Sequence, residues 1–381
     1  PIEPYYFFVP KDLTLQNEYN KFWKITDIFK EWSSGVTTHR DHFVVGFMRK
    51  EIVQRLGIFK SNLPNEFVSQ SLRLKDTGTW NLAEARQKIK GQKPEDKIHR
   101  YAYRPYDLRF VCYDPVLIDR VRLPFMNNLK WENIALLCMR EVVIESGFSH
   151  IFVSDRISDR RMFLSNRGAP YLFPLYLYPD ELVGATHELP LRKTSQAKRI
   201  PNFTNEFLQA VKQSLGSKPS PEEIFYYIYA VLYSPTYRKR YEEFLKIDFP
   251  RIPLPSNKAL FKKLSNLGKE LVDLHLLRHP SLDDTEIGFP KGGSNTVEKV
   301  MYDEQNQRAF INKEQYFEGV SKEVWKYRIG AYQVMEKYLK DRKKRKLSLE
   351  ETNHYMKVAK AIRLTVELQE KIDDVYRKIE I

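Results

Sequence analysis

The sequence predicts an α+β protein, with a mixed, β-rich lobe over residues 1–180 followed by a mainly helical lobe over residues 181–381. Hydrophobic residues make up 42% of the 381-residue chain and aromatic residues 13%, which is enough apolar surface for two buried cores. Short runs of aromatic and β-branched residues fill the first half, and apolar residues at helical spacing fill the second. Together these patterns predict the α+β class.

The first lobe begins with β-like runs around a helical pattern. The runs are "PYYFFVP" and "HFVVGF", and the segment between them, residues 13–32, repeats apolar residues every three to four positions. Five further strand-sized segments follow, each bounded by Pro, Asp or Asn. They are "RYAYRPY", "LRFVCY", "NIALLCM", "HIFVSD" and "YLFPLYLY".

The second lobe begins after a polar linker over residues 185–202. Ser220 and Glu223 form the pattern of a capping box at the start of a helix, which should stop at Ser234 before Pro235. A short helix, the extended segment "FPRIPLP" and a leucine-spaced helix ending near His275 follow. Beyond a polar stretch with "KGGSN" and two candidate β runs, two last helices are predicted. Ser348 and Glu351 cap the second of these.

The charge of the chain points to a polyanionic partner. The net charge is +14 and the isoelectric point is near 9.4, which favours DNA, RNA or an acidic surface. No apolar run approaches the length of a bilayer span, so a cytoplasmic protein is expected. Cys112 and Cys138 lie in apolar segments and are expected to be buried thiols in a reducing compartment. Because the chain opens on Pro1 within a strand-like run, it is expected to be part of a longer polypeptide.

Catalytic motifs are absent from the sequence. There is no nucleotide-binding glycine loop, no nucleophile elbow and no Asn-Pro-Pro-aromatic run of the kind that holds a flipped base. We therefore expect no catalytic residue, no metal and no bound cofactor in this segment. One alternative is a metal-dependent nuclease that uses Asp76, Glu95 and Lys97. A second weak pattern, His39, Asp41 and His42, is more typical of a loop than of a metal site.

Arginine and asparagine dominate the basic stretches of the first lobe, whereas lysine is frequent in the second. Arginine and asparagine pair bidentately with guanine and adenine, so base reading is expected in the first lobe. Lysine suits phosphates, so part of the backbone contact is expected in the second. The opposing interpretation is that arginines beside Asp107, Asp119 and Asp155 form ion pairs that hold loops. The candidate DNA-binding residues are Arg40, Arg100, Arg104, Arg120, Arg122, Asn127, Asn128, Arg156, Arg160, Arg161, Arg167, Arg238, Lys239, Arg240, Lys343 and Lys344.

Particular strings resemble the C-terminal target-recognition region of type ISP restriction-modification enzymes, and of related type IIG-like adenine DNA methyltransferases. They are "YRPYDLRFVCYDP", "RVRLPFMNNL", "HIFVSDRISDR", "IFYYIYAVLYSPTYRKRYEEFLKIDFPRIPLP" and "GAYQVMEKYLKDRKKRKLS", in that order along the chain. The resemblance implies a module that recognises double-stranded DNA and directs adenine-N6 methylation and restriction by upstream domains. It also implies a methyltransferase domain as partner in the same polypeptide. S-adenosylmethionine, with ATP and Mg²⁺ as further candidates, is implied for the parent enzyme.

Strings shared among enzymes of different specificity are expected to serve as scaffold, because base-reading residues must vary with the target. On this hypothesis specificity lies in the inserts at residues 60–93, 161–168 and 186–199, and Asp107 with its arginines holds a frame that presents them. A remaining alternative is a generic RNA or single-strand binder that stacks bases on tyrosines.

Overall fold

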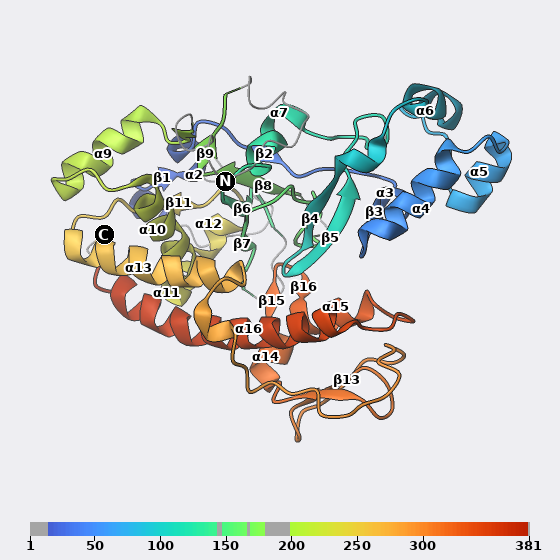
Figure 1. Cartoon of the computed structure of the whole chain (residues 1–381). Helices are drawn as coiled ribbons and strands as arrows, with labels where there is room; N and C mark the ends of the chain where they lie inside the picture. The colour runs from blue at the N-terminus through green and yellow to red at the C-terminus, as the bar shows by residue number, and fades with distance from the viewer. Residues whose placement is uncertain (1–13, 143–146, 166–167, 180–198, 380–381) are drawn as a thin grey trace.

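The computed structural model describes residues 14–142, 147–165, 168–179 and 199–379, and it confirms the α+β class. A four-stranded antiparallel sheet in the order β2-β8-β6-β7 lies near the centre, and a three-stranded sheet in the order β3-β5-β4 lies beside it (Figure 1). Their strands are β2 (Ser33–Ser34), β8 (Pro170–Pro174), β6 (Ala135–Met139), β7 (Ile151–Ser154), β3 (Val45–Gly46), β5 (Asp107–Cys112) and β4 (Ile98–Arg104).

Short helices surround these sheets in the first half of the chain. Three of them, α4 to α6, project from the β3-β5-β4 sheet to one end of the molecule (Figure 1). This end contains most of the insert at residues 60–93. The helices are α1 (Gln16–Tyr19), α2 (Ile25–Ile28), α3 (Asp41–Val44), α4 (Arg49–Lys60), α5 (Asn65–Leu72), α6 (Leu82–Ile89), η1 (Pro94–Lys97), α7 (Leu123–Met126) and η2 (Asn127–Leu129).

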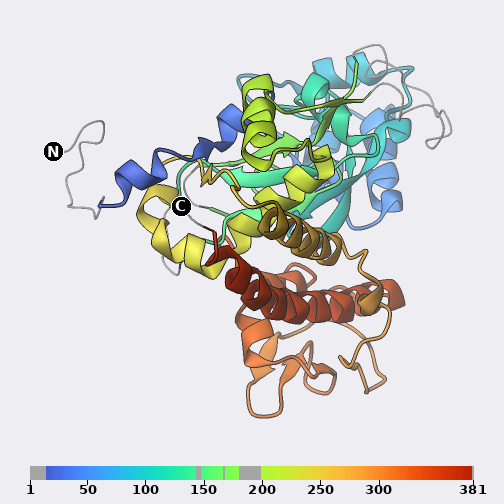
Figure 2. The same ribbon diagram turned by 90° about the vertical axis from the view of Figure 1, so that its left-hand side faces the viewer.

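The long helices α10, α13 and α16 pack on one another as a layer and lie against the four-stranded sheet. A small sheet of β12 to β14 lies on the other side of α16 (Figure 1 and Figure 2). The Tyr233 hydroxyl of α10 donates to the carbonyl of Ile151 in β7 at 2.8 Å, which ties layer and sheet together. The helices of this half are α9 (Asn205–Leu215), α10 (Pro221–Tyr233), α11 (Pro235–Arg240), α12 (Glu242–Leu245), α13 (Lys258–His275), η3 (Pro280–Leu282), α14 (Lys322–Lys326), α15 (Val334–Lys340) and α16 (Leu349–Tyr376).

Short paired strands complete the described segments. One pair joins residues far apart in sequence, because Trp23 and Lys24 of β1 pair with Ile252 and Arg251 of β11. The remaining strands are β1 (Trp23–Lys24), β9 (Tyr176–Leu177), β10 (Ile200–Pro201), β11 (Arg251–Ile252), β12 (Met301–Asp303), β13 (Arg308–Phe310), β14 (Tyr316–Glu318), β15 (Arg328–Ile329) and β16 (Tyr332–Gln333). No helix of the described segments is long and apolar enough to cross a membrane.

Most of the predicted elements that fall on described residues are present, whereas the predicted run "PYYFFVP" lies outside the described residues. Both capping boxes form, at Ser220 with Glu223 and at Ser348 with Glu351, and the leucine-spaced helix ends at His275. Two predictions were partly wrong. The run "HFVVGF" is mainly the short helix α3 followed by a two-residue strand, and the described part of the helical pattern, residues 14–32, forms two four-residue helices with β1 between them rather than one long helix. The predicted lobe boundary at residues 180 and 181 and most of the linker lie outside the described residues, so the division into two lobes stays a prediction.

Substitution of Gly268 by alanine is expected to lower the free energy of unfolding by about 1 to 3 kcal/mol or more. The two helices α10 and α13 approach so closely that a Cβ at Gly268 would overlap the backbone carbonyl of Tyr226. Gly57 in α4 is the matched control, because a Cβ there meets no atom within 4 Å. Gly57→Ala should raise the stability by roughly 0.5 to 1 kcal/mol. Urea unfolding of both variants measures the difference, and equal effects would contradict the close helix packing.

His275 predicts a pH dependence of stability. Burial, and then the charge of Arg238, lower the pKa of His275 to about 3, and its ring contacts the hydroxyls of Tyr229 and Thr365. In the unfolded chain the pKa is about 6.5, so below that pH only the unfolded state binds the proton. Stability should therefore fall as the pH drops from about 6.5 toward 3, by up to roughly 1.4 kcal/mol per pH unit.

Unfolding midpoints between pH 7 and 5 for wild type and His275→Asn test this dependence. The number of protons taken up on unfolding, given by the slope of stability against pH, should be smaller by about one in the variant than in wild type. Some slope remains in the variant because burial also lowers the pKa values of His99 and His150 to about 4. An identical slope in both proteins would show that His275 does not contribute.

Candidate nucleic-acid interface

Three loops that the sequence analysis considered separately lie side by side. Val36 forms a parallel bridge with Asp159, and Thr37 forms an antiparallel bridge with Arg120. The Arg160 amide donates to the carbonyl of Val36 at 2.8 Å, and the amides of Thr37 and Arg120 donate to each other's carbonyls at 3.1 and 3.0 Å. We call residues 35–40, 119–122 and 158–161 the three-loop surface.

Gly35 allows this close approach of backbones. A Cβ at this position would lie 2.6 Å from the amide nitrogen of Arg160 and 2.6 Å from the carbonyl carbon of Asp159. Both distances are far below van der Waals contact, so a larger residue would force the loops apart. The glycine therefore sets the spacing between the first loop and the loop that contains Arg160 and Arg161.

Four of the predicted DNA-binding arginines gather on the three-loop surface. The Arg120 side chain is 54% exposed, and its Nε lies 3.6 Å from the Asp119 carboxylate. Arg122 and Arg161 are exposed and Arg160 is half-buried. Among the described residues, no ion pair forms with Arg122, Arg160 or Arg161. The surface therefore presents guanidinium groups in the form that bidentate contacts with DNA bases or phosphates require.

Two residues of this surface have left-handed backbone. Arg122 adopts φ 56° immediately before α7, and His39 adopts φ 55°. This conformation is uncommon for residues with a side chain, and such residues concentrate at functional sites. His39 also lies 3.3 Å from Asp119, so its imidazole belongs to the same polar surface.

A buried hydrogen-bond network supports the surface from below. The carboxylate of Asp159 accepts from the Tyr101 hydroxyl at 2.7 Å, from Arg104 Nη1 at 2.8 Å and from the Arg161 amide at 2.6 Å. The Arg104 guanidinium also stacks over the Tyr103 ring, 3.9 Å from its centroid. Because Tyr101 and Arg104 lie in β4 and are buried, their bonds to Asp159 hold the loop with Arg160 and Arg161 in one position on the sheet.

Four of the predicted DNA-binding residues are buried in this structure, and their DNA-binding role stays a prediction. Arg40, Arg104, Asn127 and Asn128 are between 4% and 7% exposed. Arg40 donates to the carbonyl of Leu117 and stacks on Trp80, and Asn128 bonds the backbone of Phe125 and Tyr178. Side chains committed in this way do not reach a base edge in this conformation.

The remaining candidates are dispersed. Arg100 is exposed on β4 with its guanidinium over Phe110, and Arg156 pairs with Asp155 at 3.1 Å. Arg240 pairs with Glu18 at 2.8 Å, whereas Lys343 and Lys344 are exposed after α15. Arg238 and Lys239 belong to α11, which lies well away from α7 in Figure 1. Arg167 lies outside the described residues.

The geometry does not support the nuclease alternative. Asp76 accepts from the Leu82 amide at the start of α6, Glu95 binds Lys60 at 3.1 Å, and Lys97 binds Asp114 at 2.7 Å. These side chains are engaged with three different partners rather than with one site. Within residues 14–142 and the other described ranges, no group of three or more His, Cys, Asp or Glu side chains is placed to hold a metal ion.

Sequence reasoning missed two cations that lie beside predicted ones. Lys326 and Arg328 line a pocket together with Arg238 and Lys239, although 86 or more residues separate the two pairs in sequence. The only signal was the short string "WKYR", which places Tyr327 between the two cations. Such a string does not by itself predict which distant helix it will meet.

Comparison with known proteins identifies the family. A family model described as "Type ISP C-terminal specificity domain" matches residues 27–371. A search of curated proteins gives no match.

Three solved structures share the fold. One, a nuclease-deletion mutant of the Type ISP restriction-modification enzyme LlaGI in complex with a DNA substrate mimic, aligns with a TM-score of 0.61 and 18% identity. The ATP-dependent Type ISP restriction-modification enzyme LlaBIII bound to DNA gives 0.71 and 18%, and a DrdV–DNA complex gives 0.69 and 19%. The alignments cover 93%, 95% and 95% of this chain, but only 29%, 24% and 39% of those chains. The resemblance seen in the sequence is thus confirmed, and the chain belongs to the Type ISP C-terminal specificity domain family.

Proposed function

We propose that this chain is a sequence-specific double-stranded DNA recognition module whose three-loop surface contacts the target. The observation that carries the proposal is the convergence of the loops that contain Arg120, Arg122, Arg160 and Arg161 on one surface. The net charge of +14 adds a general attraction to DNA. Family membership and the DNA-bound state of the structural neighbours support the same ligand.

The catalytic steps belong to other domains in this proposal. The chain spans between 24% and 39% of its structural neighbours, so most of each neighbour lies outside the aligned region. We propose that a methyltransferase domain of the same polypeptide, with S-adenosylmethionine, transfers a methyl group to an adenine that the recognition module selects. ATP and Mg²⁺ would serve the restriction activity of that parent enzyme.

The alternative of a generic single-strand binder has less support. That function needs exposed aromatic rings on which bases stack. The largest fully buried side chains include Tyr101, Tyr229, Tyr233, Tyr237 and Tyr241, so these rings pack the core instead. The aromatic content of the sequence therefore reflects packing around α10 and α11 more than a stacking platform.

Competition between duplex and single-stranded oligonucleotides tests the proposal. A labelled duplex is bound to the chain in about 150 mM salt and then mixed with unlabelled competitor. Unlabelled duplex should displace it, whereas the same concentration of single strand should displace much less. Equal displacement by both competitors would contradict duplex recognition. Absence of binding to either nucleic acid would contradict the proposal altogether.

A further inference from the structure

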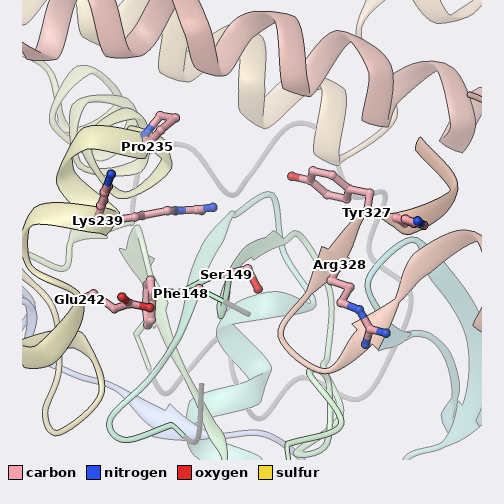
Figure 3. A pocket seen from close by; sticks show the side chains of 10 residues that line it. Phe148, Ser149, Pro235, Lys239, Glu242, Tyr327 and Arg328 are labelled. Carbon is pink, nitrogen blue, oxygen red and sulfur yellow. The ribbon is translucent and has the colours of Figure 1, made fainter. Parts of the chain in front are cut away.

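A second cationic site lies apart from the three-loop surface. It is a pocket of about 540 Å³ between α11, the loop at residues 147–149 and the segment before β15. Figure 3 shows Lys239 on one side of this pocket, Tyr327 and Arg328 on the other, and Ser149 between them. The elements on the two sides come from distant parts of the sequence, so the fold and not a local charge run creates the site.

The charge balance of the pocket is positive. Its described lining includes Arg238, Lys239, Lys326 and Arg328, against one carboxylate, Glu242. Glu242 in turn lies 3.8 Å from Lys246, so its charge is shared with a residue outside the lining. Four cations therefore face a space with little internal compensation, which favours an anionic ligand.

The Arg238 side chain is held in a fixed position at the wall of the pocket. The Arg238 Nε donates to the carbonyl of Leu232 at 2.6 Å, and its guanidinium lies 4.3 Å from the Tyr233 ring centroid, which fixes the side chain. Its Nη2 is enclosed by the protein rather than open to the pocket. Arg238 therefore contributes a fixed positive charge beside the pocket.

The opposite wall adds further donors. Within the described part of the chain, Arg328 makes two long hydrogen bonds, at 3.5 Å to the Ala331 carbonyl and at 3.3 Å to the Gln333 side chain, so its guanidinium can turn to a ligand. The Ser149 Oγ accepts from the Gly330 amide at 3.2 Å, which leaves its own hydroxyl proton to donate. Two guanidinium groups, two ammonium groups and a hydroxyl around one space match the acceptor oxygens of a phosphate.

The geometry points to a phosphate pocket that binds the phosphate group of a nucleotide, either within a nucleic-acid strand or free. The volume exceeds that of a phosphate alone and leaves room for the attached sugar beside Phe148 and Tyr327. The inference rests on the proposed function only where the phosphate belongs to bound DNA. The free-nucleotide form is independent of it.

Calorimetric titration with adenosine monophosphate tests the pocket directly. The test variant is Lys239→Gln combined with Lys326→Gln and Arg328→Gln, all exposed positions whose loss should leave the fold intact. Circular dichroism verifies the fold. The matched control is Lys263→Gln, an exposed lysine of α13 outside the pocket. Wild type and control should bind the nucleotide, and the triple variant should bind at least tenfold more weakly.

Duplex binding by the same proteins identifies the source of the phosphate. If the pocket holds a backbone phosphate, the triple variant should bind duplex more weakly than wild type. The slope of log affinity against log salt concentration should also become shallower, by about 0.9 for each phosphate contact that is lost. Loss of nucleotide binding with unchanged duplex binding would assign the site to a free nucleotide. If the wild-type protein binds the nucleotide but not duplex DNA, the phosphate pocket is supported and the proposed DNA-recognition function is contradicted.

Two results would overturn the pocket. One is nucleotide binding that the triple variant retains in full. The other is the absence of nucleotide binding by wild type together with duplex affinity and salt dependence that the triple variant leaves unchanged.

Discussion

Replacement of Arg342 by alanine is expected to lower the free energy of unfolding by about 3 to 5 kcal/mol, because it removes one of the two arginines that neutralise a buried carboxylate. Arg342 is 3% exposed and donates from Nη2 to Asp107 at 2.8 Å and from Nε to Glu351 at 3.1 Å. Asp107 is fully buried and also accepts two bonds from Arg109. This cluster joins β5 to the helices α15 and α16.

The pH dependence of Asp107 gives this prediction a second readout. Burial alone would raise the pKa of Asp107, but the charges of Arg342 and Arg109 outweigh it and lower the pKa to about 2. The unfolded value is about 3.9, so the cluster stabilises the protein above that pH and the contribution is lost as the pH falls toward 2. Arg342→Ala should lose less stability over that interval than wild type.

Lys343→Ala is the matched control for Arg342→Ala, because Lys343 is the next residue and is exposed. Its effect on urea unfolding at neutral pH should stay within about 0.5 kcal/mol. A loss below about 1 kcal/mol in Arg342→Ala would show that the cluster does not hold the two parts of the fold together.

Simultaneous replacement of Arg120, Arg122, Arg160 and Arg161 by glutamine is expected to weaken duplex binding by at least about a hundredfold. Each bidentate base contact contributes roughly 1 to 3 kcal/mol, and each phosphate contact contributes about 0.9 to the salt slope. The four side chains are exposed or half-buried, so stability should change little. Fluorescence anisotropy with a labelled duplex at several salt concentrations measures both quantities.

Lys263→Gln again serves as control, since it removes a cation from the exposed face of α13. If the quadruple variant and the control bind duplex equally, the three-loop surface is not the DNA-binding site. If affinity falls by the same factor for every duplex sequence, the arginines contact phosphates rather than bases.

Local patterns in the sequence predicted much of the fold. Capping boxes and apolar spacing depend on neighbouring residues, so α10, α13 and α16 begin or end where the sequence indicated. The segment at residues 13–32 did not follow its helical pattern. There Trp23 and Lys24 pair with Ile252 and Arg251, a strand contact from far along the chain that no local pattern reveals.

In the candidate site, too, contacts between residues close in sequence were predicted and contacts between distant residues were not. The pairs Asp107 with Arg109 and Asp155 with Arg156 are close in sequence, and the ion-pair interpretation of them is confirmed. Arg104 instead meets Asp159, which is 55 residues away, and its burial in that pair could not be foreseen. The backbone bridges of Val36 with Asp159 and of Thr37 with Arg120, which form the three-loop surface, likewise depend on tertiary structure and not on local sequence.

Selection of bound sequences from a randomised duplex library tests sequence-specific recognition by the three-loop surface most directly. The wild-type chain should enrich a defined motif, and Lys263→Ala should enrich the same one. Arg161→Ala, in the insert at residues 161–168, should retain the motif except for relaxed preference at the base pair that the lost arginine contacts, whereas Arg120→Ala, in a shared string, should keep the whole motif with weaker binding. Recovery of random sequence by wild type, or of one identical motif by all four proteins, would contradict that recognition.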